Sequence, residues 1–491
     1  MPVAPDYLPA PCHQELGDAF YDVVDAAPFP EHRLRFRNQP WAQRVGLGPL
    51  KDDEWCRHFA GFESLPDNLR QPLALRYHGH QFRTYNPELG DGRGFLFAQL
   101  RDPVDGRLLD LGTKGSGRTP WSRGADGRLT LKGGVREVLA SEMLEALGCY
   151  TSKSLSLIET GEPLMRHDEP SPTRSSVLVR LSHSHIRIGT FQRLELLGEH
   201  DALRRLVDHS IEQYWPEAAE DRDPVAGLLS RVVRATAEMT AEWWTAGFVH
   251  GVLNTDNVVI TGESFDYGPW RFLPHMDPEF TAAYFDYMKL YAFGRQPGAM
   301  IWNLEQLARS LAPLSNAAAL QQRVSAFEAV FDRAVVARTF ARLGLHPPQE
   351  AERARSLAGG FFDAMHQTQV PFQRPFFDLV GGACEDRMAA SPEHNVYQSE
   401  AWRPVIEALR ACDPVPGVAT MATQPYWQQE ASCQLVVRDV EAIWDAIAQR
   451  DDWSLFDGTI DKLRSMGEAY RSLGFTADAM RQREEWSGNE R

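Results

Sequence analysis

The chain has 491 residues, of which 43% are apolar and 24% charged, and its formal net charge is −16. This composition is typical of a folded globular protein, and the acidic charge argues against a nucleic-acid partner while leaving room for a local nucleotide site. No apolar run predicts a membrane span and no signal peptide is visible, so we expect a cytoplasmic protein, and we expect it to be a monomer.

Residues 1–75 are rich in proline and tryptophan and only weakly periodic, which predicts an extension packed on a core. Within residues 76–190, two apolar runs joined by a turn at Asp105 and Gly106 predict a β-hairpin that ends at Lys114. A helix is predicted over 132–147, followed by strands at 152–160 and 175–182. This β-β-α-β-β order is that of a kinase small lobe.

Residues 191–480 are mostly helical in pattern. Apolar positions at helical intervals predict helices over 203–215, 225–247, 300–311, 317–343 and 435–448, with a short strand at 258–260. Residues 481–491 form a polar tail. We therefore predict an α+β, protein-kinase-like bilobal fold, with an N-terminal extension, a small β-rich N-lobe and a larger helical C-lobe.

The segment HGVLNTDN at 250–257, followed by DYG at 266–268, carries the clearest chemical signal. Kinase-like enzymes use one Asp to orient the acceptor, and an Asn and a second Asp to hold magnesium. Small-molecule kinases of that fold commonly write this loop as His-Gly-Asp, with Asn seven positions after the His. Asn257 keeps this offset from His250, but Val252 occupies the Asp position and Asp256 lies beside the Asn. The enzyme is either inactive or has a rearranged site.

Two further residues fit a phosphate-binding pair. In kinases a strand lysine binds phosphate and a glutamate on the next helix holds it, as Lys114 and Glu137 are spaced to do. Only six lysines accompany 45 arginines, so few other lysines are candidates. Asn257 and Asp266 offer oxygen ligands of the kind that magnesium prefers. The alternatives are a loop lysine, a surface glutamate and polar turn residues.

Glycine-rich segments at 90–94, 114–120 and 123–128 allow backbone amides to approach phosphate oxygens, although most such segments are ordinary turns. Asp126, in the third segment, equally suits a turn. Arg180 and Arg187 leave the predicted small lobe on an extended segment and could both reach a polyphosphate. His183 and His185 alternate between them, but no third zinc ligand follows at diagnostic spacing.

Taken together, these segments resemble the selenoprotein O (YdiU) family of protein adenylyltransferases. The resemblance runs in family order through YHGHQF (77–82), LGDGR (89–93), KGSGRTPWSRGADGR (114–128), RE (136–137), HGVLNTDN (250–257) and FDYGP (265–269). The chain departs from the family at Arg83, where a small residue is expected. It also has no cysteine after Cys433, which argues against redox control through a terminal thiol.

The resemblance implies a kinase-like fold that binds ATP turned around, so that the α-phosphate faces the acceptor. AMP then moves to Ser, Thr or Tyr hydroxyls of protein substrates and pyrophosphate leaves; UMP transfer from UTP is a variant of the same chemistry. By this analogy Asp256 is the base, Asn257 and Asp266 hold Mg²⁺ or Mn²⁺, and Glu137 supports Lys114. The implied nucleotide site comprises Gly90, Gly92, Arg93, Lys114, Asp126, Gly127, Arg180, Arg187 and Asp266.

Two other functions remain open. A kinase would transfer the γ-phosphate of ATP to a small molecule, and a pseudokinase scaffold would bind nucleotide without catalysis. The retained Lys114, Glu137, Asn257 and Asp266 argue against the scaffold, which needs no complete metal site.

Overall fold

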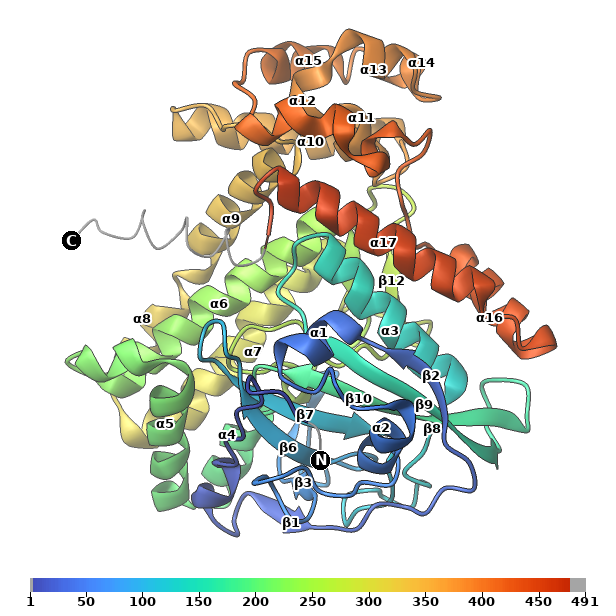
Figure 1. The fold of residues 1–491 in the computed structure, drawn as a ribbon. Helices are drawn as coiled ribbons and strands as arrows, with labels where there is room; N and C mark the ends of the chain where they lie inside the picture. The colour runs from blue at the N-terminus through green and yellow to red at the C-terminus, as the bar shows by residue number, and fades with distance from the viewer. Residues whose placement is uncertain (1–2, 477–491) are drawn as a thin grey trace.

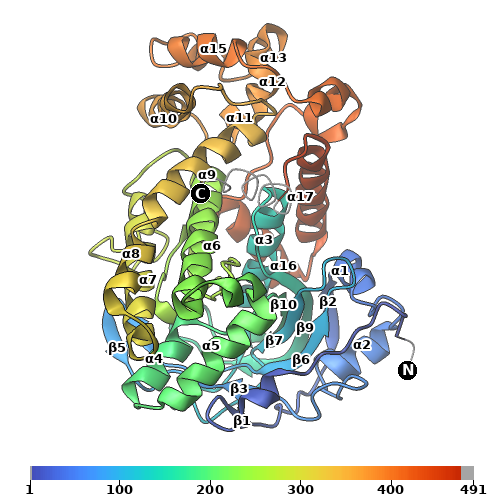
Figure 2. The same cartoon turned by 90° about the vertical axis from the view of Figure 1, so that its left-hand side faces the viewer.

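The computed structural model describes residues 3–476 and shows a mixed α/β architecture (Figures 1 and 2). An antiparallel sheet built largely from the first third of the chain lies beside a helical region that follows it. The predicted tail at 481–491 lies outside the described residues. No helix within residues 3–476 has the length and apolar character needed to cross a bilayer.

The main sheet has eight strands, seven of them in the order β1-β3-β6-β7-β10-β9-β2, with β8 paired to β10. All of its ladders are antiparallel. The strands are β1 (Tyr21–Val23), β2 (Arg33–Arg37), β3 (Leu73–Leu75), β6 (Leu96–Arg101), β7 (Leu108–Lys114), β8 (Leu129–Thr130), β9 (Lys153–Leu164) and β10 (Thr173–Ser182). The predicted hairpin is confirmed as β6–β7, and the two later predicted strands as β9 and β10.

Helix α3 (Leu131–Ala146) confirms the predicted helix and packs on β9 and β10. Thr130 caps its first turn by accepting a hydrogen bond from the Gly133 amide. Gly134 faces the sheet so closely that a Cβ there would lie 2.4 Å from Leu157 Cδ1. The helix is therefore held at a fixed distance from the strands beneath it.

Residues 1–75 do more than pack against the core. They supply three sheet strands, β1, β2 and β3, and the short helices α1 (Gln39–Arg44) and α2 (Asp52–Phe59). Each of the three strands has only three to five residues, too few to show a period in the sequence.

The helical region is built around α6 (Pro224–Ala246), which packs against α7, α8 and α9. Asp223 caps the start of α6 and Gly247 ends it in the left-handed conformation, as expected of a C-terminal glycine. The other helices here are α4 (Ile188–Leu196), α5 (His200–Tyr214), α7 (Gln296–Leu311), α8 (Ala317–Val324), α9 (Phe327–Arg342), α10 (Ala351–Thr368), α11 (Arg374–Asp378), α12 (Val380–Ala383), α13 (Glu385–Ala389), α14 (His394–Tyr397) and α15 (Arg403–Arg410).

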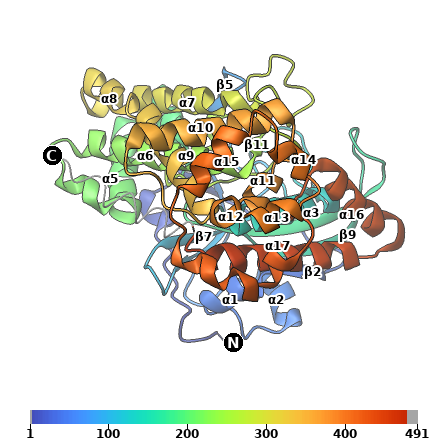
Figure 3. The same ribbon diagram turned by 90° about the horizontal axis from the view of Figure 1, so that it is seen from above.

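The last two helices, α16 (Val437–Arg450) and α17 (Ser454–Ser472), return to the sheet region. Helix α17 lies beside α3, as the views from the front and from above both show (Figures 1 and 3). Gly467 of α17 is so close that a Cβ there would stand 3.2 Å from Ala146 Cα.

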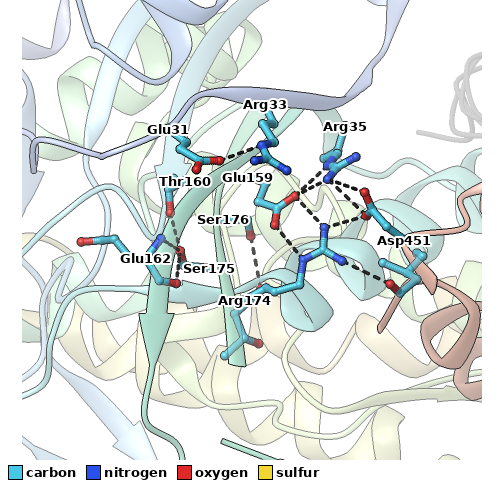
Figure 4. A network of polar contacts seen from close by, with 12 residues as sticks. Glu31, Arg33, Arg35, Glu159, Thr160, Glu162, Arg174, Ser175, Ser176 and Asp451 are labelled. Atoms are coloured by element: carbon cyan, nitrogen blue, oxygen red, sulfur yellow. Dashed lines mark hydrogen bonds and ion pairs between the residues drawn. The ribbon is translucent and has the colours of Figure 1, made fainter. Parts of the chain in front are cut away.

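An ion-pair network fixes the end of α16 to the sheet (Figure 4). Glu159 on β9 binds Arg35 of β2 at 2.6 Å and Arg174 of β10 at 2.7 Å. Both arginines also reach Asp451, which follows α16, at 3.2 and 2.7 Å. Four parts of the chain therefore meet at one point on the sheet surface.

Two predicted elements differ from the structure. The segment 317–343 is broken at residues 325–326 into α8 and α9, with Asn316 capping α8. The expected strand at 258–260 is wrong, because only Val259 makes an isolated bridge, to Arg187, before the chain turns. The apolar run is buried, and its backbone bonds to residues 186 and 188 without forming a ladder.

Candidate functional site

A cleft of about 320 Å³ opens between the sheet and the start of the helical region. It gathers residues from segments far apart in the sequence: the first glycine-rich segment, the end of β7, the end of β10 and the two loops after α6. The residues predicted from sequence that line it are Gly90, Gly92, Arg93, Lys114, Arg180, Arg187, Asp256 and Asp266.

Lys114 lies between two carboxylates at the floor of the cleft. Its Nζ contacts Glu137 Oε1 from α3 and lies 2.8 Å from Asp266 Oδ1. The Lys114 and Glu137 side chains are only 6% and 3% exposed, so water screens these contacts poorly. Lys114 thus links the sheet, α3 and the loop after α6 through one ammonium group.

Arg180 and Arg187 line the cleft beside Lys114. We call these three residues the cationic wall. Arg180 Nη1 lies 3.4 Å from Asp266 Oδ1, and Arg187 Nη1 lies 3.6 Å from Asp266 Oδ2. Burial alone would raise the pKa of Asp266, but Lys114 and these two guanidinium groups hold it well below its ordinary value. Asp266 is therefore an anion at neutral pH, surrounded by three cations.

The same arginines stack on aromatic rings that fix their planes. The Arg180 guanidinium carbon lies 4.3 Å from the centre of the Phe265 ring, and that of Arg187 lies 4.3 Å from the Tyr77 ring. Stacking of this kind orients a guanidinium group while leaving its N–H edge free to bind anions.

Asp91 joins the glycine segment to the cationic wall. Its Oδ1 lies 3.1 Å from Arg187 Nη2, and its Oδ2 accepts the Leu75 amide at 3.1 Å. The glycines beside it are required by close packing: a Cβ on Gly90 would stand 2.4 Å from the Trp121 ring, and one on Gly92 would stand 2.8 Å from the Trp121 carbonyl oxygen. The segment 90–94 is thus pressed against the loop around Trp121.

Asp256 lies on a short 3₁₀ turn (Thr255–Asn257) at the other side of the cleft. It is only 7% exposed, and its Oδ1 has no hydrogen-bond partner among the residues of 3–476. Burial raises the pKa of Asp256 to about 6, although nearby Arg187 opposes the shift. An unpartnered buried carboxylate that ionises near neutrality is suited to accept a proton from a bound group.

The loop that carries Asp256 is held on both sides. Arg187 Nη1 donates to the Asp256 carbonyl oxygen at 2.9 Å, and the Thr255 hydroxyl accepts the His80 amide at 2.7 Å. His250, at the start of the loop, lies 3.1 Å from the Phe265 carbonyl oxygen through Nε2 and accepts the Val252 amide through Nδ1. His250 therefore joins the two loops that present Asp256 and Asp266.

Besides the supporting Glu137, three residues of the predicted site do not line the cleft. Asp126 pairs with Arg166 at 2.6 Å on the surface and accepts the Arg128 amide. Gly127 adopts a φ of +70°, and a Cβ there would stand 2.2 Å from the Gly117 carbonyl oxygen. Asn257 donates its Nδ2 hydrogen bond to the Val252 carbonyl oxygen at 3.0 Å.

Oxygen donors from two loops suit a hard divalent cation. The bond from Asn257 Nδ2 leaves the amide oxygen of that side chain as a ligand, and Asp266 contributes an ionised carboxylate. No group of three or more His, Cys, Asp or Glu side chains is arranged to hold a metal in the part of the chain that the structure describes. These two oxygen donors are of the kind that a hard divalent cation takes when it keeps most of its waters.

Other cleft residues were not predicted individually. Tyr77, Asp91, Thr113, Trp121 and Arg123 line the cleft beside the predicted set. Asp91 and Arg123 lie inside the glycine-rich segments, so their position in the sequence was a usable signal. Tyr77 and Trp121 act through ring packing, which leaves no distinctive spacing in the sequence.

The chain is similar to known proteins over nearly its whole length. A family model described as protein adenylyltransferase SelO matches residues 6–464. A protein nucleotidyltransferase YdiU from Synechocystis sp. is 43% identical over 477 residues, covering 93% of this chain and 97% of the relative. Proteins of the same name from Gloeobacter violaceus and Cereibacter sphaeroides are 44% and 36% identical, over 94% and 89% of this chain and 95% and 94% of their own lengths.

Proposed function

Because the chain belongs to the protein adenylyltransferase SelO family and is a nucleotidyltransferase, we propose that it transfers AMP from ATP to Ser, Thr or Tyr hydroxyls of proteins. The observation that carries this proposal is the pairing, across one cleft, of a cationic wall with a buried carboxyl group. The wall suits a polyphosphate, and Asp256 suits an acceptor hydroxyl.

We place this chemistry in a kinase-like bilobal fold. Residues 76–190 form the small lobe, residues 191–480 the helical lobe, and residues 1–75 the extension. The Lys114–Glu137 contact between β7 and α3 and the position of the cleft between sheet and helices support the two lobes, while β1, β2 and β3 of the extension belong to the same sheet as the small lobe.

Four cationic residues of the cleft bind the phosphates of the nucleotide. Lys114, Arg180 and Arg187 neutralise the phosphates, and Arg93 adds a further cation at the glycine segment. Gly90 and Gly92 keep that segment pressed to the Trp121 loop, which brings its backbone to the cleft. We include Asp126 and Gly127 in the nucleotide site because the family resemblance implies them.

In the reaction the acceptor oxygen attacks the α-phosphorus and forms the new P–O bond. The bond between the α-phosphorus and the oxygen that bridges to the β-phosphorus breaks, and pyrophosphate leaves with that electron pair. Asp256 takes the hydroxyl proton, for which its unpartnered Oδ1 is available. Because the transition state of such transfers is loose, positioning and charge contribute more than proton removal.

Asn257 and Asp266 would hold the divalent metal, Mg²⁺ or Mn²⁺. When bound, such an ion neutralises charge on the phosphates. Asp266 also orients the three cations that bind it, since Lys114, Arg180 and Arg187 all contact its carboxylate.

ATP labelled on either the α- or the γ-phosphate tests the proposal. We expect the α-label to appear on protein and the γ-label to leave in pyrophosphate; γ-label on a product would identify a kinase instead. Parallel reactions with α-labelled UTP and Mn²⁺ measure UMP transfer by the same site. A protein that binds ATP but transfers neither label would be a scaffold.

A further inference from the structure

A group of large apolar side chains is exposed to solvent on the loop between β12 (Trp270–Phe272) and α7. Tyr284, Tyr287 and Met288 are 81%, 84% and 83% exposed, and Phe285 between them is 40% exposed. We call these four residues the 284–288 patch. Isolated exposed apolar residues are normal, but several in one short segment mark a binding surface.

The loop that carries the patch is held in place by hydrogen bonds. Asp286 accepts the amides of Leu290 and Tyr291 at 2.9 and 2.8 Å. The Phe293 amide donates to the Phe280 carbonyl oxygen at 2.9 Å, which closes the base of the loop. The apolar side chains are thus displayed by a bonded turn.

The patch is continuous with the wall of the cleft. Gln81, the last residue of β4 (Gly79–Gln81), lines the cleft, and Phe82 follows it. The Phe82 ring lies 5.9 Å from that of Phe285 and 5.1 Å from that of Tyr291. A path through Gln81 and the rings of Phe82 and Phe285 therefore leads from the cleft to the patch.

Hydrogen bonds tie this path to the proposed base. Asn254 Oδ1 accepts the Phe82 amide at 3.0 Å and the Tyr291 hydroxyl at 2.8 Å. Asn254 lies two residues before Asp256 in the same loop. The loop that contains Asn254 and Asp256 is thus bonded to the residues beneath the patch. A chain bound at the patch is therefore held at a fixed position relative to Asp256.

The charged side chains of the loop are bound to one another or to backbone amides. Glu279 Oε2 lies 3.4 Å from both Lys289 Nζ and Arg295 Nη2, and the Asp286 carboxylate is bound to backbone amides. The apolar side chains of the patch are therefore available to a partner beside these paired, half-exposed charges. Aromatic and methionine side chains are common anchors in protein recognition.

From these contacts we propose that the 284–288 patch binds the protein acceptor, as an extended segment with aromatic or long aliphatic residues close to the hydroxyl that receives AMP. The inference rests on the proposed transferase function. In an extended segment successive residues are about 3.3–3.6 Å apart, so neighbours of a hydroxyl held at Asp256 run outward along the path to the patch.

Short synthetic peptides containing one Ser, Thr or Tyr test this proposal, with either Leu and Phe or Gln and Gly beside the hydroxyl residue. With α-labelled ATP, we expect the unaltered enzyme to prefer the apolar peptides. The double variant Tyr284→Ser/Tyr287→Ser should lose about tenfold in kcat/KM on those peptides, through KM, and should keep its rate on the polar peptides and its affinity for ATP.

The matched control is Val104→Ser/Met165→Ser, which removes two apolar side chains of similar exposure, 73% and 71%, from loops that do not line the cleft. It should behave as the unaltered enzyme. Equal labelling of apolar and polar peptides by the unaltered enzyme, or an unchanged preference in the patch variant, overturns the inference alone.

Labelling of no peptide by the unaltered enzyme overturns the proposed function and the inference with it. The alternative partner for the 284–288 patch is a second copy of the chain. A dimer seen by sedimentation equilibrium that the patch variant abolishes would assign the patch to self-association and overturn acceptor binding.

Discussion

At the scale of single residues, the cleft depends on charges that balance only as a group. Lys114 bridges Glu137 and Asp266, and Arg180 and Arg187 share the Asp266 carboxylate. When one member of a buried ion group is removed, an uncompensated charge stays behind, which costs more than the pair contributed. Each of these residues is therefore expected to affect stability as well as activity.

Lys114→Met keeps most of the side-chain stem and removes the charge. We expect a loss of about 3–5 kcal/mol in the free energy of unfolding, because Glu137 and Asp266 lose their shared partner. Binding of ATP should also weaken at least about tenfold. Urea unfolding and calorimetric titration with a non-hydrolysable ATP analogue measure the two effects. Lys462→Met, at an exposed position of α17, is the control and should change neither quantity.

Asp256→Asn removes the proton acceptor and preserves the size of the side chain. The bond that Arg187 donates to residue 256 uses its backbone oxygen, so it survives the change. We expect AMP transfer to fall by about 10²–10⁴ while ATP affinity stays within about twofold. Rapid-quench measurement of α-label transfer is the assay, and a variant that transfers at the normal rate would refute the role of Asp256.

Sequence reasoning located residues whose chemistry is tied to type and spacing, such as Lys114, Glu137 and Asp266. It did not single out Tyr77 or Trp121, because their contribution is the ring surface on which Arg187 or Gly90 packs. It also treated the glycines as phosphate contacts or ordinary turn residues. The structure adds a steric reason, since the Trp121 loop leaves no room for a Cβ at Gly90.

At the scale of elements, the distance between α3 and the sheet decides where Glu137 lies. Gly134 precedes Glu137 by about one turn, and a Cβ at Gly134 would stand 2.4 Å from Leu157 Cδ1 and 2.8 Å from Ser176 Oγ. A larger residue there must displace the buried Leu157 and Ser176 side chains or move the helix away from β9 and β10.

Gly134→Ala tests this dependence. Alanine favours a helix by about 1 kcal/mol, but overpacking against the sheet costs about 1–3 kcal/mol, so we expect a net loss of stability together with slower transfer. Gly133→Ala is the matched control, because Gly133 is only half-buried and its Cβ would meet a single side chain closer than 3 Å, Leu129 at 2.8 Å. Thermal unfolding and α-label transfer should separate the two variants, and equal behaviour would contradict the proposed contact.

Long periodic segments such as α3 and α6 were predicted well because their apolar spacing is a local property. The break between α8 and α9 was not, since both helices continue the same apolar pattern across residues 325–326. The run at 258–260 has the composition of a strand, yet only Val259 makes a bridge. Burial in a loop and burial in a sheet select the same residue types, so sequence alone does not separate them.

At the scale of the whole molecule, the C-terminal helices brace the sheet region. Arg464 of α17 binds Glu142 of α3 at 2.9 Å, across 322 residues of sequence. Burial raises the pKa of Glu142 even beside Arg464, so ionising this carboxyl costs stability as the pH rises through its folded pKa.

Arg464→Ala removes the counter-charge and raises the pKa of Glu142 further. The protonated form is then favoured more strongly, so the loss of stability should be small at pH 5 and should grow to about 2 kcal/mol at pH 8. Urea unfolding at the two pH values measures this difference. Lys132→Ala removes the more exposed pair between α3 and Glu441 of α16, and should cost less than about 1 kcal/mol at either pH.

The sequence predicted a mixed α+β chain with its strands first, and the arrangement of sheet and helices agrees with that order. It described residues 1–75 as packed on the core but missed that β1, β2 and β3 are members of the sheet. Pairing of such short strands is set by partners far along the chain, such as Glu159 for Arg35. Long-range contacts of this kind leave no local pattern to detect.

The contact between α17 and α3 has a consequence for biosynthesis. Chains fold from their N-terminus as they leave the ribosome, and every residue that lines the cleft precedes residue 267. The surface of α3 that α17 covers nevertheless stays open to water until residues 454–472 have emerged. A nascent chain therefore holds all of the residues that line the cleft long before the helix that carries Glu137 is braced, and the enzyme matures late in its own translation.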